Sequence, residues 1–111
     1  MKIEQQQHGA VLVLVPHGPL VRDDVEELRG KIRAGVRAHA GRLVLDMEDV
    51  PYLDSVGIEL LADECTGQVG GDRPRLASLT ETCRESLDLT DVLLQLDVFD
   101  GVESAIRSCK R

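Results

Sequence analysis

The sequence predicts an α/β fold in which a largely parallel sheet is covered by helices. Short runs rich in valine and leucine recur at wide intervals along the chain. The segments between them carry apolar residues every three or four positions, which is the spacing of a helix with one buried face. Strands that alternate with helices favour a parallel sheet. With 111 residues the chain fits one compact domain, residues 1–111.

Four apolar runs are the predicted strands, and their continuous valine and leucine content is typical of strands buried on both faces. They are Ala10–Val15, Arg42–Asp46, Arg75–Leu79 and Leu96–Phe99. The segment from Lys2 to Gln7 adds a short antiparallel edge strand.

Two longer helices are predicted between these strands. The first spans residues 22–38 and ends near Gly41, with Asp24 and Glu27 spaced like a capping box at its start. The second opens at Asp54–Ser55 and is terminated by Gly70–Gly71. Their apolar positions are Val25, Leu28, Ile32 and Val36 in the first helix, and Ile58, Leu61, Ala62, Cys65 and Val69 in the second.

Two shorter helices complete the prediction. Thr80 is the expected N-cap of a third helix. Asp100 is the expected N-cap of a fourth, with Glu103 at the third helical position. The inward-facing residues are Cys83 and Leu87 in the third helix, and Val102, Ala105, Ile106 and Cys109 in the fourth. The segment between them, residues 89–95, is too short to classify.

Charge and composition exclude several classes of function. Twenty acidic residues against 13 basic ones give a net charge of -7, which repels phosphate backbones and anionic lipid surfaces. One Tyr, one Phe and no Trp cannot form an aromatic platform for stacked bases. We therefore expect neither nucleic acid nor a membrane as a partner.

The cysteine spacing, the short apolar runs and the N-terminal sequence predict a protein of a reducing compartment. Three widely separated cysteines, Cys65, Cys83 and Cys109, give neither a disulfide framework nor a CxxC metal site, and we expect buried thiols. The longest apolar stretch is far shorter than the roughly 20 residues that cross a bilayer. No secretory signal pattern is present at the N-terminus. The sequence thus predicts a cytoplasmic protein with no metal and no cofactor.

The most informative passage is residues 43–58, where a buried strand runs into an acidic loop and a helix then begins. Pro51 prevents the helix from starting early, and Ser55 is placed at the helix N-terminus, beyond the end of a parallel strand. Open α/β sheets usually carry their sites at that edge. We expect the Ser55 hydroxyl to be accessible. Gly57 follows in the first turn, where glycine lowers helix propensity and leaves room for a partner's backbone.

Three other interpretations of this passage remain open. Asp54 or Ser55 could serve only as the helix N-cap. An enzyme would need Ser55 activated by His17 and oriented by Asp46, although no G-x-S-x-G elbow, metalloprotease or nucleotide-binding motif is present. A response-regulator receiver would use Asp46 as phospho-acceptor, but the acidic pair after the first strand and the lysine after the fifth are missing.

The stretch from Leu43 to Gly57, LVLDMEDVPYLDSVG, resembles the signature of the STAS domain, the fold of bacterial anti-sigma factor antagonists. In that family a strand ending in Asp leads through a short loop to D-S-x-G. The likeness continues through Gly70–Gly71, ASL at residues 77–79, LDLTDVL at 87–93, LDVF at 96–99 and SAI at 104–106. The chain departs from the family at residues 17–23 and at Arg73–Pro74–Arg75. The resemblance implies a four- or five-stranded mixed sheet flanked by about four helices.

The same resemblance implies a binding module rather than an enzyme. It assigns Ser55 the role of the residue phosphorylated by an anti-sigma factor, a serine kinase that brings its own ATP. The docking face would include Asp54, Ser55, Val56, Gly57 and Glu59, and a serine phosphatase could reset the switch. STAS domains also serve in stressosomes, lipid-transport complexes and anion-transporter tails, so a scaffold subunit is the alternative role.

Overall fold

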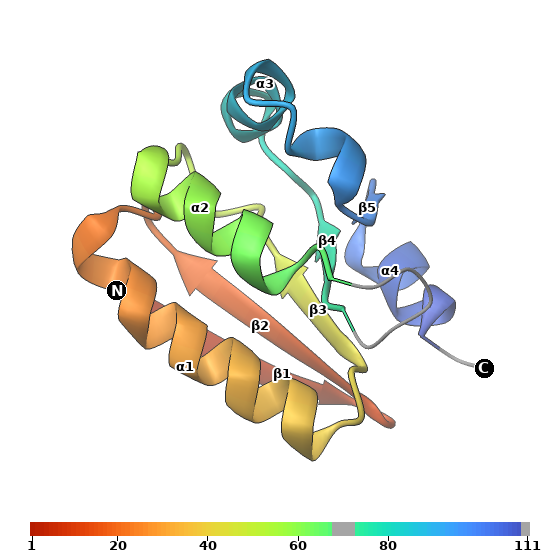
Figure 1. The fold of residues 1–111 in the computed structure, drawn as a ribbon. Coiled ribbons are helices and arrows are strands. Elements are labelled where there is room, and N and C mark those ends of the chain that lie inside the picture. Colours follow the sequence, from red (N-terminus) through yellow and green to blue (C-terminus); the bar gives the residue numbers. More distant parts are fainter. Residues whose placement is uncertain (68–72, 110–111) are drawn as a thin grey trace.

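The structure is a computed structural model that describes residues 1–67 and 73–109 of the chain (Figure 1). Strands and helices alternate after an initial hairpin. The strands are β1 (Lys2–His8), β2 (Val11–His17), β3 (Leu43–Asp46), β4 (Arg75–Ala77) and β5 (Val98–Phe99). The helices are α1 (Arg22–Ala38), α2 (Ser55–Glu64), α3 (Glu81–Leu89), the 3-10 helix η1 (Leu93–Gln95) and α4 (Val102–Ser108).

The strands form one five-stranded sheet in the order β1-β2-β3-β4-β5. Strand β1 pairs with β2 antiparallel, and the other three pairings are parallel. This mixed, largely parallel sheet with four α-helices confirms the predicted fold class, including the antiparallel edge strand.

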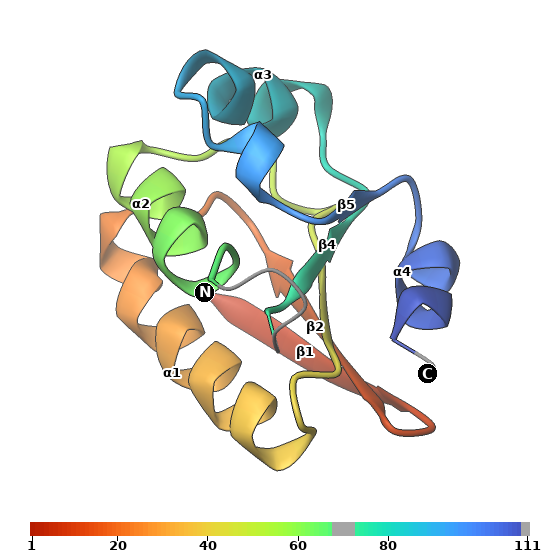
Figure 2. The ribbon, with the colours of Figure 1, turned by 45° about the vertical axis from the view of Figure 1, so that its right-hand side comes forward.

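Side chains on the two faces of the sheet belong to two separate cores. The face toward α1 and α2 carries leucines, and the opposite face, which α4 covers, carries mainly valines and alanine (Figure 2). The leucines from the sheet are Leu12, Leu14, Leu43, Leu45 and Leu76, and the small residues opposite are Val11, Val13, Val15, Val44 and Ala77. Two covered faces explain why the central strands are continuously apolar.

The three cysteines are placed as the sequence predicts. Cys65, Cys83 and Cys109 are all buried free thiols, as expected, and burial raises the pKa of the Cys65 thiol far above its ordinary value. Large apolar side chains that remain exposed are Tyr52, Leu89 and Leu94. Among the described residues, none of the helices has both the length and the apolar character needed to span a membrane.

Two of the predicted helix N-caps are absent, and a third is confirmed. Helix α1 begins after Val21, whose side chain makes no capping bond, so the Asp24–Glu27 capping box does not form. Helix α4 begins after Gly101 instead of Asp100, again without a side-chain cap. The predicted Thr80 cap of α3 is confirmed, because its hydroxyl accepts a bond from the Cys83 N–H at 3.3 Å.

Helix α2 ends earlier than predicted. Its last residue is Glu64, with Cys65 as C-cap, so it does not continue to Val69. Gly67 has a left-handed φ of 62°, a conformation that does not continue a helix, and the Thr66 hydroxyl bonds back to the Ala62 carbonyl. The predicted terminators Gly70 and Gly71 lie outside the described residues.

Strands β4 and β5 are shorter than predicted. They span Arg75–Ala77 and Val98–Phe99, because Ser78 leaves the strand with a φ of 59° and η1 precedes β5. Arg73 and Arg75 are accommodated by polar partners at the sheet margin: Arg73 makes a two-pronged bond with Asp97, and Arg75 donates to the Ser108 hydroxyl.

Candidate functional site

The candidate site lies where β2 and β3 end, and backbone hydrogen bonds join the two loops that leave these strands. Gly18 N–H donates to the Asp49 carbonyl at 3.0 Å, and Leu20 N–H donates to the Tyr52 carbonyl at 3.1 Å. Leu20 also forms an isolated parallel bridge with Leu53. The loops therefore continue the parallel pairing beyond the strands and hold the start of α2 beside the start of α1.

Asp54 caps two helices with one carboxylate. Its Oδ1 accepts from the Gly57 N–H at 2.8 Å, in the first turn of α2, and its Oδ2 accepts from the Arg22 N–H at 2.9 Å, at the first residue of α1. The bonds from Gly57 and Arg22 lower the pKa of Asp54 below its ordinary value. The sequence left open whether Asp54 or Ser55 caps α2, and in the structure Asp54 is the cap.

Ser55 is the first residue of α2 and is exposed. Since Asp54 provides the cap, the Ser55 hydroxyl is not needed for helix capping, and within the described part of the chain it has no hydrogen-bond partner. The first N–H groups of a helix are unpaired and carry partial positive charge. Ser55 therefore presents a free hydroxyl in a setting that tolerates added negative charge.

Gly57 is needed for packing within the chain. It is buried, and a Cβ added there would lie 2.3 Å from the Leu20 carbonyl oxygen and 3.3 Å from Leu20 Cγ. The close backbone approach predicted for a partner is instead made by the chain's own loop after β2. A methyl group at position 57 would therefore force this loop to shift.

The other predicted docking residues differ in exposure. Glu59 is exposed, one turn after Ser55, whereas Val56 is half-buried and packs against the leucine core. Tyr52, three residues before Ser55, is 48% exposed. Tyr52 and Glu59 are thus the exposed side chains that flank Ser55 in the sequence.

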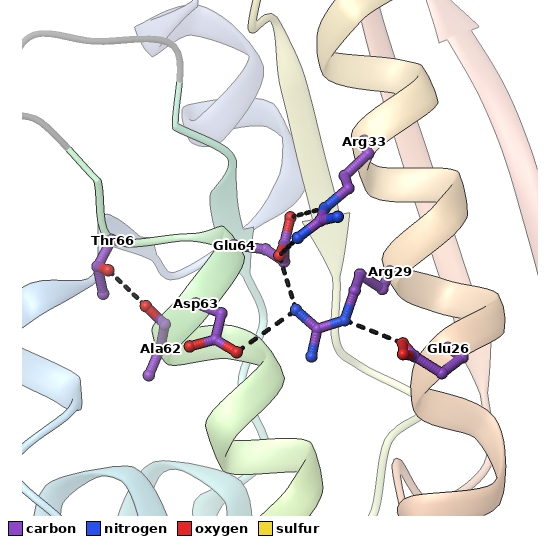
Figure 3. Close-up of polar contacts among 7 residues, drawn as sticks. All are labelled: Glu26, Arg29, Arg33, Ala62, Asp63, Glu64 and Thr66. Atoms are coloured by element: carbon purple, nitrogen blue, oxygen red, sulfur yellow. Dashed lines mark hydrogen bonds and ion pairs between the residues drawn. The ribbon is translucent and has the colours of Figure 1, made fainter.

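Helix α2 is also held against α1 by a cluster of charges at its far end (Figure 3). The Glu64 carboxylate accepts from Arg29 Nη1 at 2.7 Å and from Arg33 Nε and Nη2, both at 3.0 Å. Burial opposes ionisation of Glu64, but the bonds from Arg33 and Arg29 outweigh it and lower its pKa. Asp54 and Glu64 therefore fix the two ends of α2 relative to α1.

The catalytic set considered for a hydrolase is not assembled. His17 is held between two carboxylates, with Nδ1 2.7 Å from Asp49 Oδ2 and Nε2 2.8 Å from Glu4 Oε1. Asp46 Oδ1 accepts from the Glu48 N–H. Neither His17 nor Asp46 is bonded to Ser55, so no base among the residues that the structure describes activates this serine.

The receiver alternative conflicts with the sheet. Receivers use a wholly parallel order 2-1-3-4-5, whereas here the first strand is an antiparallel edge and the order follows the chain. Across residues 1–67 and 73–109, no three His, Cys, Asp or Glu side chains are grouped so that they could hold a metal ion.

Sequence reasoning did not identify Leu20 and Arg22 as parts of the site. Their contribution is made by backbone atoms, the Leu20 carbonyl against Gly57 and the Arg22 N–H on Asp54, so side-chain identity gives no signal. The available signal is topological: the ends of neighbouring parallel strands meet at one edge, which places residues 18–22 beside residues 49–57.

Comparison with known proteins gives a consistent family. Residues 2–105 match the STAS domain family. No curated protein matches the chain. Among solved structures, an anti-sigma factor antagonist from Mycobacterium paratuberculosis has 21% identity and a TM-score of 0.81, covering 99% of this chain and 94% of that one. The putative anti-sigma factor antagonist TM1081 from Thermotoga maritima has 17% identity and a TM-score of 0.75, covering 98% and 95%.

Membrane transporters contain the same fold. The murine anion transporter Slc26a9 matches with 21% identity and a TM-score of 0.72, covering 95% of this chain but only 18% of the transporter. At these identities the solved structures establish a shared fold. Together with the match over nearly the whole sequence, they show that this chain belongs to the STAS domain family.

Proposed function

We propose that this protein is an anti-sigma factor antagonist, a cytoplasmic binding module switched by phosphorylation of Ser55. The observation that supports it most directly is the exposed Ser55 hydroxyl, which the Asp54 cap leaves free at the start of α2. The unphosphorylated module binds a regulatory serine kinase and sequesters it from a sigma factor. The phosphorylated module releases it.

The chemical step belongs to the partner. Ser55 Oγ attacks the γ-phosphorus of ATP held by the kinase, an O–P bond forms, and the bond from that phosphorus to the β-phosphate oxygen breaks. ADP leaves, and the hydroxyl proton passes to a base of the kinase. The STAS domain supplies an accessible nucleophile and no catalytic group. A serine phosphatase would restore the hydroxyl by hydrolysis.

The fold can carry the added phosphate. A phosphoserine brings about -1.5 to -2 charges and three acceptor oxygens, and at the start of α2 this charge lies at the positive end of the helix dipole. Asp54 lies next to the new charge, but both its oxygens already accept backbone N–H bonds. The phosphorylated domain should therefore remain folded.

A bound partner cannot accommodate the same charge. Around Ser55 the docking face includes Asp54, Val56 and Glu59, and two of these three side chains are already acidic. A kinase surface packed against a neutral hydroxyl would have to bury a phosphate dianion beside these carboxylates, and desolvating it would cost several kcal/mol. This difference between free and bound states is what makes the modification a switch.

The proposal is tested by incubating the protein with its cognate kinase and ATP and mapping the products by mass spectrometry. We expect one phosphate per chain, located on Ser55, and none on Ser55→Ala. Ser104→Ala is the matched control, because that serine lies on α4 and bonds to the Gly101 carbonyl, and it should be phosphorylated normally.

The same experiment separates the switch from a scaffold role in a stressosome or lipid-transport complex. A scaffold subunit would bind its partner with equal affinity before and after ATP is added. Phosphate on another residue, or none at all in a complex that forms stably, would contradict the proposed function.

A further inference from the structure

Within residues 1–67 and 73–109, the outer edge of β1 has no neighbouring strand. β1 is seven residues long and stands first in the strand order. Edge strands are usually protected by a proline, a bulge, charged side chains or short length. β1 has no proline and no bulge in its regular seven-residue pairing with β2, and its charged residues Lys2 and Glu4 precede the run Gln5–Gln6–Gln7.

The pairing with β2 shows which backbone groups of β1 face outward. Leu12 donates its backbone N–H to the Arg42 carbonyl, on the β3 side of β2. Because backbone groups alternate in direction along a strand, the N–H and carbonyl groups of Val11, Val13 and Val15 point toward β1. The backbone N–H and carbonyl groups of the paired residues His8, Gln6 and Glu4 are therefore hydrogen-bonded to β2. The remaining residues, Ile3, Gln5 and Gln7, direct their N–H and carbonyl groups to the free edge.

Beside this edge lies a groove between β1 and α1, of about 580 Å³. Gln5 forms part of its wall on the sheet side, and Glu27, Gly30, Lys31 and Ala34 form the wall on the helix side. After Arg22, the first turns of α1 are acidic, and its later turns are basic. Arg29 and Arg33 of the basic part are bonded to Glu64 on α2. The acidic residues are Asp23, Asp24, Glu26 and Glu27, and the other basic ones are Lys31 and Arg37.

We propose that a second copy of this chain binds here, pairing β1 with β1 of the partner copy in antiparallel orientation to form a continuous ten-stranded sheet. Outward-facing residues must pair with outward-facing residues. The register with Gln5 opposite Gln5 pairs all seven residues, with Ile3 opposite Gln7 and Lys2 opposite His8. A shift by two residues in one direction would place Glu4 opposite Glu4, and in the other would shorten the ladder.

The two-fold axis of this dimer also brings the two α1 helices into complementary positions. They lie on the same side of the joined sheet and run antiparallel, with the groove of each copy between them. The groove of each copy is lined by acidic residues, Glu26 and Glu27, and by the basic Lys31, so the facing helices carry charges of both signs. α2 lies farther from this edge than α1 does (Figures 1 and 2). The dimer therefore leaves Ser55, the first residue of α2, exposed, and it goes beyond the proposed switch without depending on it.

Light scattering over a concentration series tests the proposal. We expect the mass to rise from 12.2 kDa toward twice that value. Gln5→Lys and Gln5→Glu should each stay monomeric, because like charges would lie directly opposite one another. Mixing these two variants should restore the dimer. Gln6→Lys is the matched control, since its side chain lies on the other face, opposite Glu4 of the partner copy, and should dimerise.

Amide hydrogen exchange locates the contact independently. The N–H groups of Ile3, Gln5 and Gln7 should become protected as concentration rises, while those of Glu4, Gln6 and His8 should be protected throughout. A mass of one chain at every concentration would overturn the proposal and leave the edge for a strand of a different protein. A dimer that Gln5→Lys does not weaken would overturn it as well.

Discussion

At the scale of single residues, the Asp54 carboxylate determines how Ser55 is presented. Asp54 accepts one N–H from each of two helices, so the neighbouring serine is released from the capping role that its residue type often fills. A free hydroxyl at a helix start is thus a consequence of the Asp-Ser pair acting together.

Replacing Asp54 with alanine should lower the melting temperature by several degrees, because both α1 and α2 lose a cap. Its pKa is depressed in the folded state, so its contribution is fully present above the unfolded value of about 3.8 and is lost as pH falls through the lower folded value. Thermal melts of wild type and Asp54→Ala from pH 7 to pH 2 measure this. A difference in melting temperature that stays constant down to pH 2 would contradict the assignment.

Gly57→Ala should destabilise the domain by about 1 to 3 kcal/mol, since the methyl group would overlap the Leu20 carbonyl and the loop would have to shift. Gly30→Ala is the matched control in α1: nothing lies within 4 Å of its added Cβ, and helix propensity should raise stability by up to about 1 kcal/mol. Urea unfolding of both variants compares the two effects. Equal shifts in the free energy of unfolding would show that packing against Leu20 does not constrain position 57.

At the scale of elements, the relation between α1 and α2 depends on Glu64. Its side chain is only 10% exposed and accepts three bonds from Arg29 and Arg33, whereas Glu26 is 82% exposed and accepts one bond from Arg29. Removing one partner of a buried ion pair is costly, whereas exposed ion pairs contribute little to the stability of the fold.

Glu64→Gln should therefore reduce the free energy of unfolding by about 1 to 3 kcal/mol, and Glu26→Gln by no more than about 0.5 kcal/mol. The pKa of Glu64 is lowered by folding, so its contribution is present above its unfolded value near 4.5 and fades as pH falls below it. Denaturant titrations at pH 7 and pH 3 are the measurement. A Glu64→Gln variant as stable as wild type at pH 7 would contradict this role.

The elements also show what the sequence can predict. Helix α1 has the predicted range because its apolar period is uninterrupted from Val25 to Val36. The central strands were recognisable because both faces of the sheet are covered. Helix ends were predicted less well: periodicity continues past Glu64 to Cys65, and the backbone turn at Gly67 ends the helix regardless of that pattern.

For the candidate site, the sequence and the family resemblance together located Ser55 and its helix, and Asp54 as one of two possible caps. They could not show that Gly57 faces Leu20 or that Arg22 bonds to Asp54. Both contacts involve backbone atoms about thirty residues apart, and they become visible only when the two loops are placed side by side.

At the scale of the whole molecule, the proposed phosphorylation would change the surface of the domain and not its shape, because the aliphatic side chains of the two cores are buried. Ser55→Asp should leave the far-UV circular dichroism spectrum nearly unchanged, because Asp54 still caps α2. A loss of helical signal would indicate that the switch works through unfolding.

Millimolar Mg²⁺ should raise the stability of the domain by no more than a few tenths of a kcal/mol, since the loop carboxylates lack the acidic pair that completes a receiver's metal site. Melting curves with and without the ion are sufficient. A shift of several degrees would show a cation site near Asp46 and would favour the receiver interpretation.

The most direct test of the phosphorylation switch is a calorimetric titration of the cognate anti-sigma kinase with the domain in two forms, unphosphorylated and phosphorylated on Ser55. We predict that the phosphorylated form, and Ser55→Asp to a lesser degree, binds at least about 100-fold more weakly, which corresponds to about 2.7 kcal/mol. Both forms should melt at similar temperatures. Equal affinity of the two forms at matched salt concentration would contradict the switch.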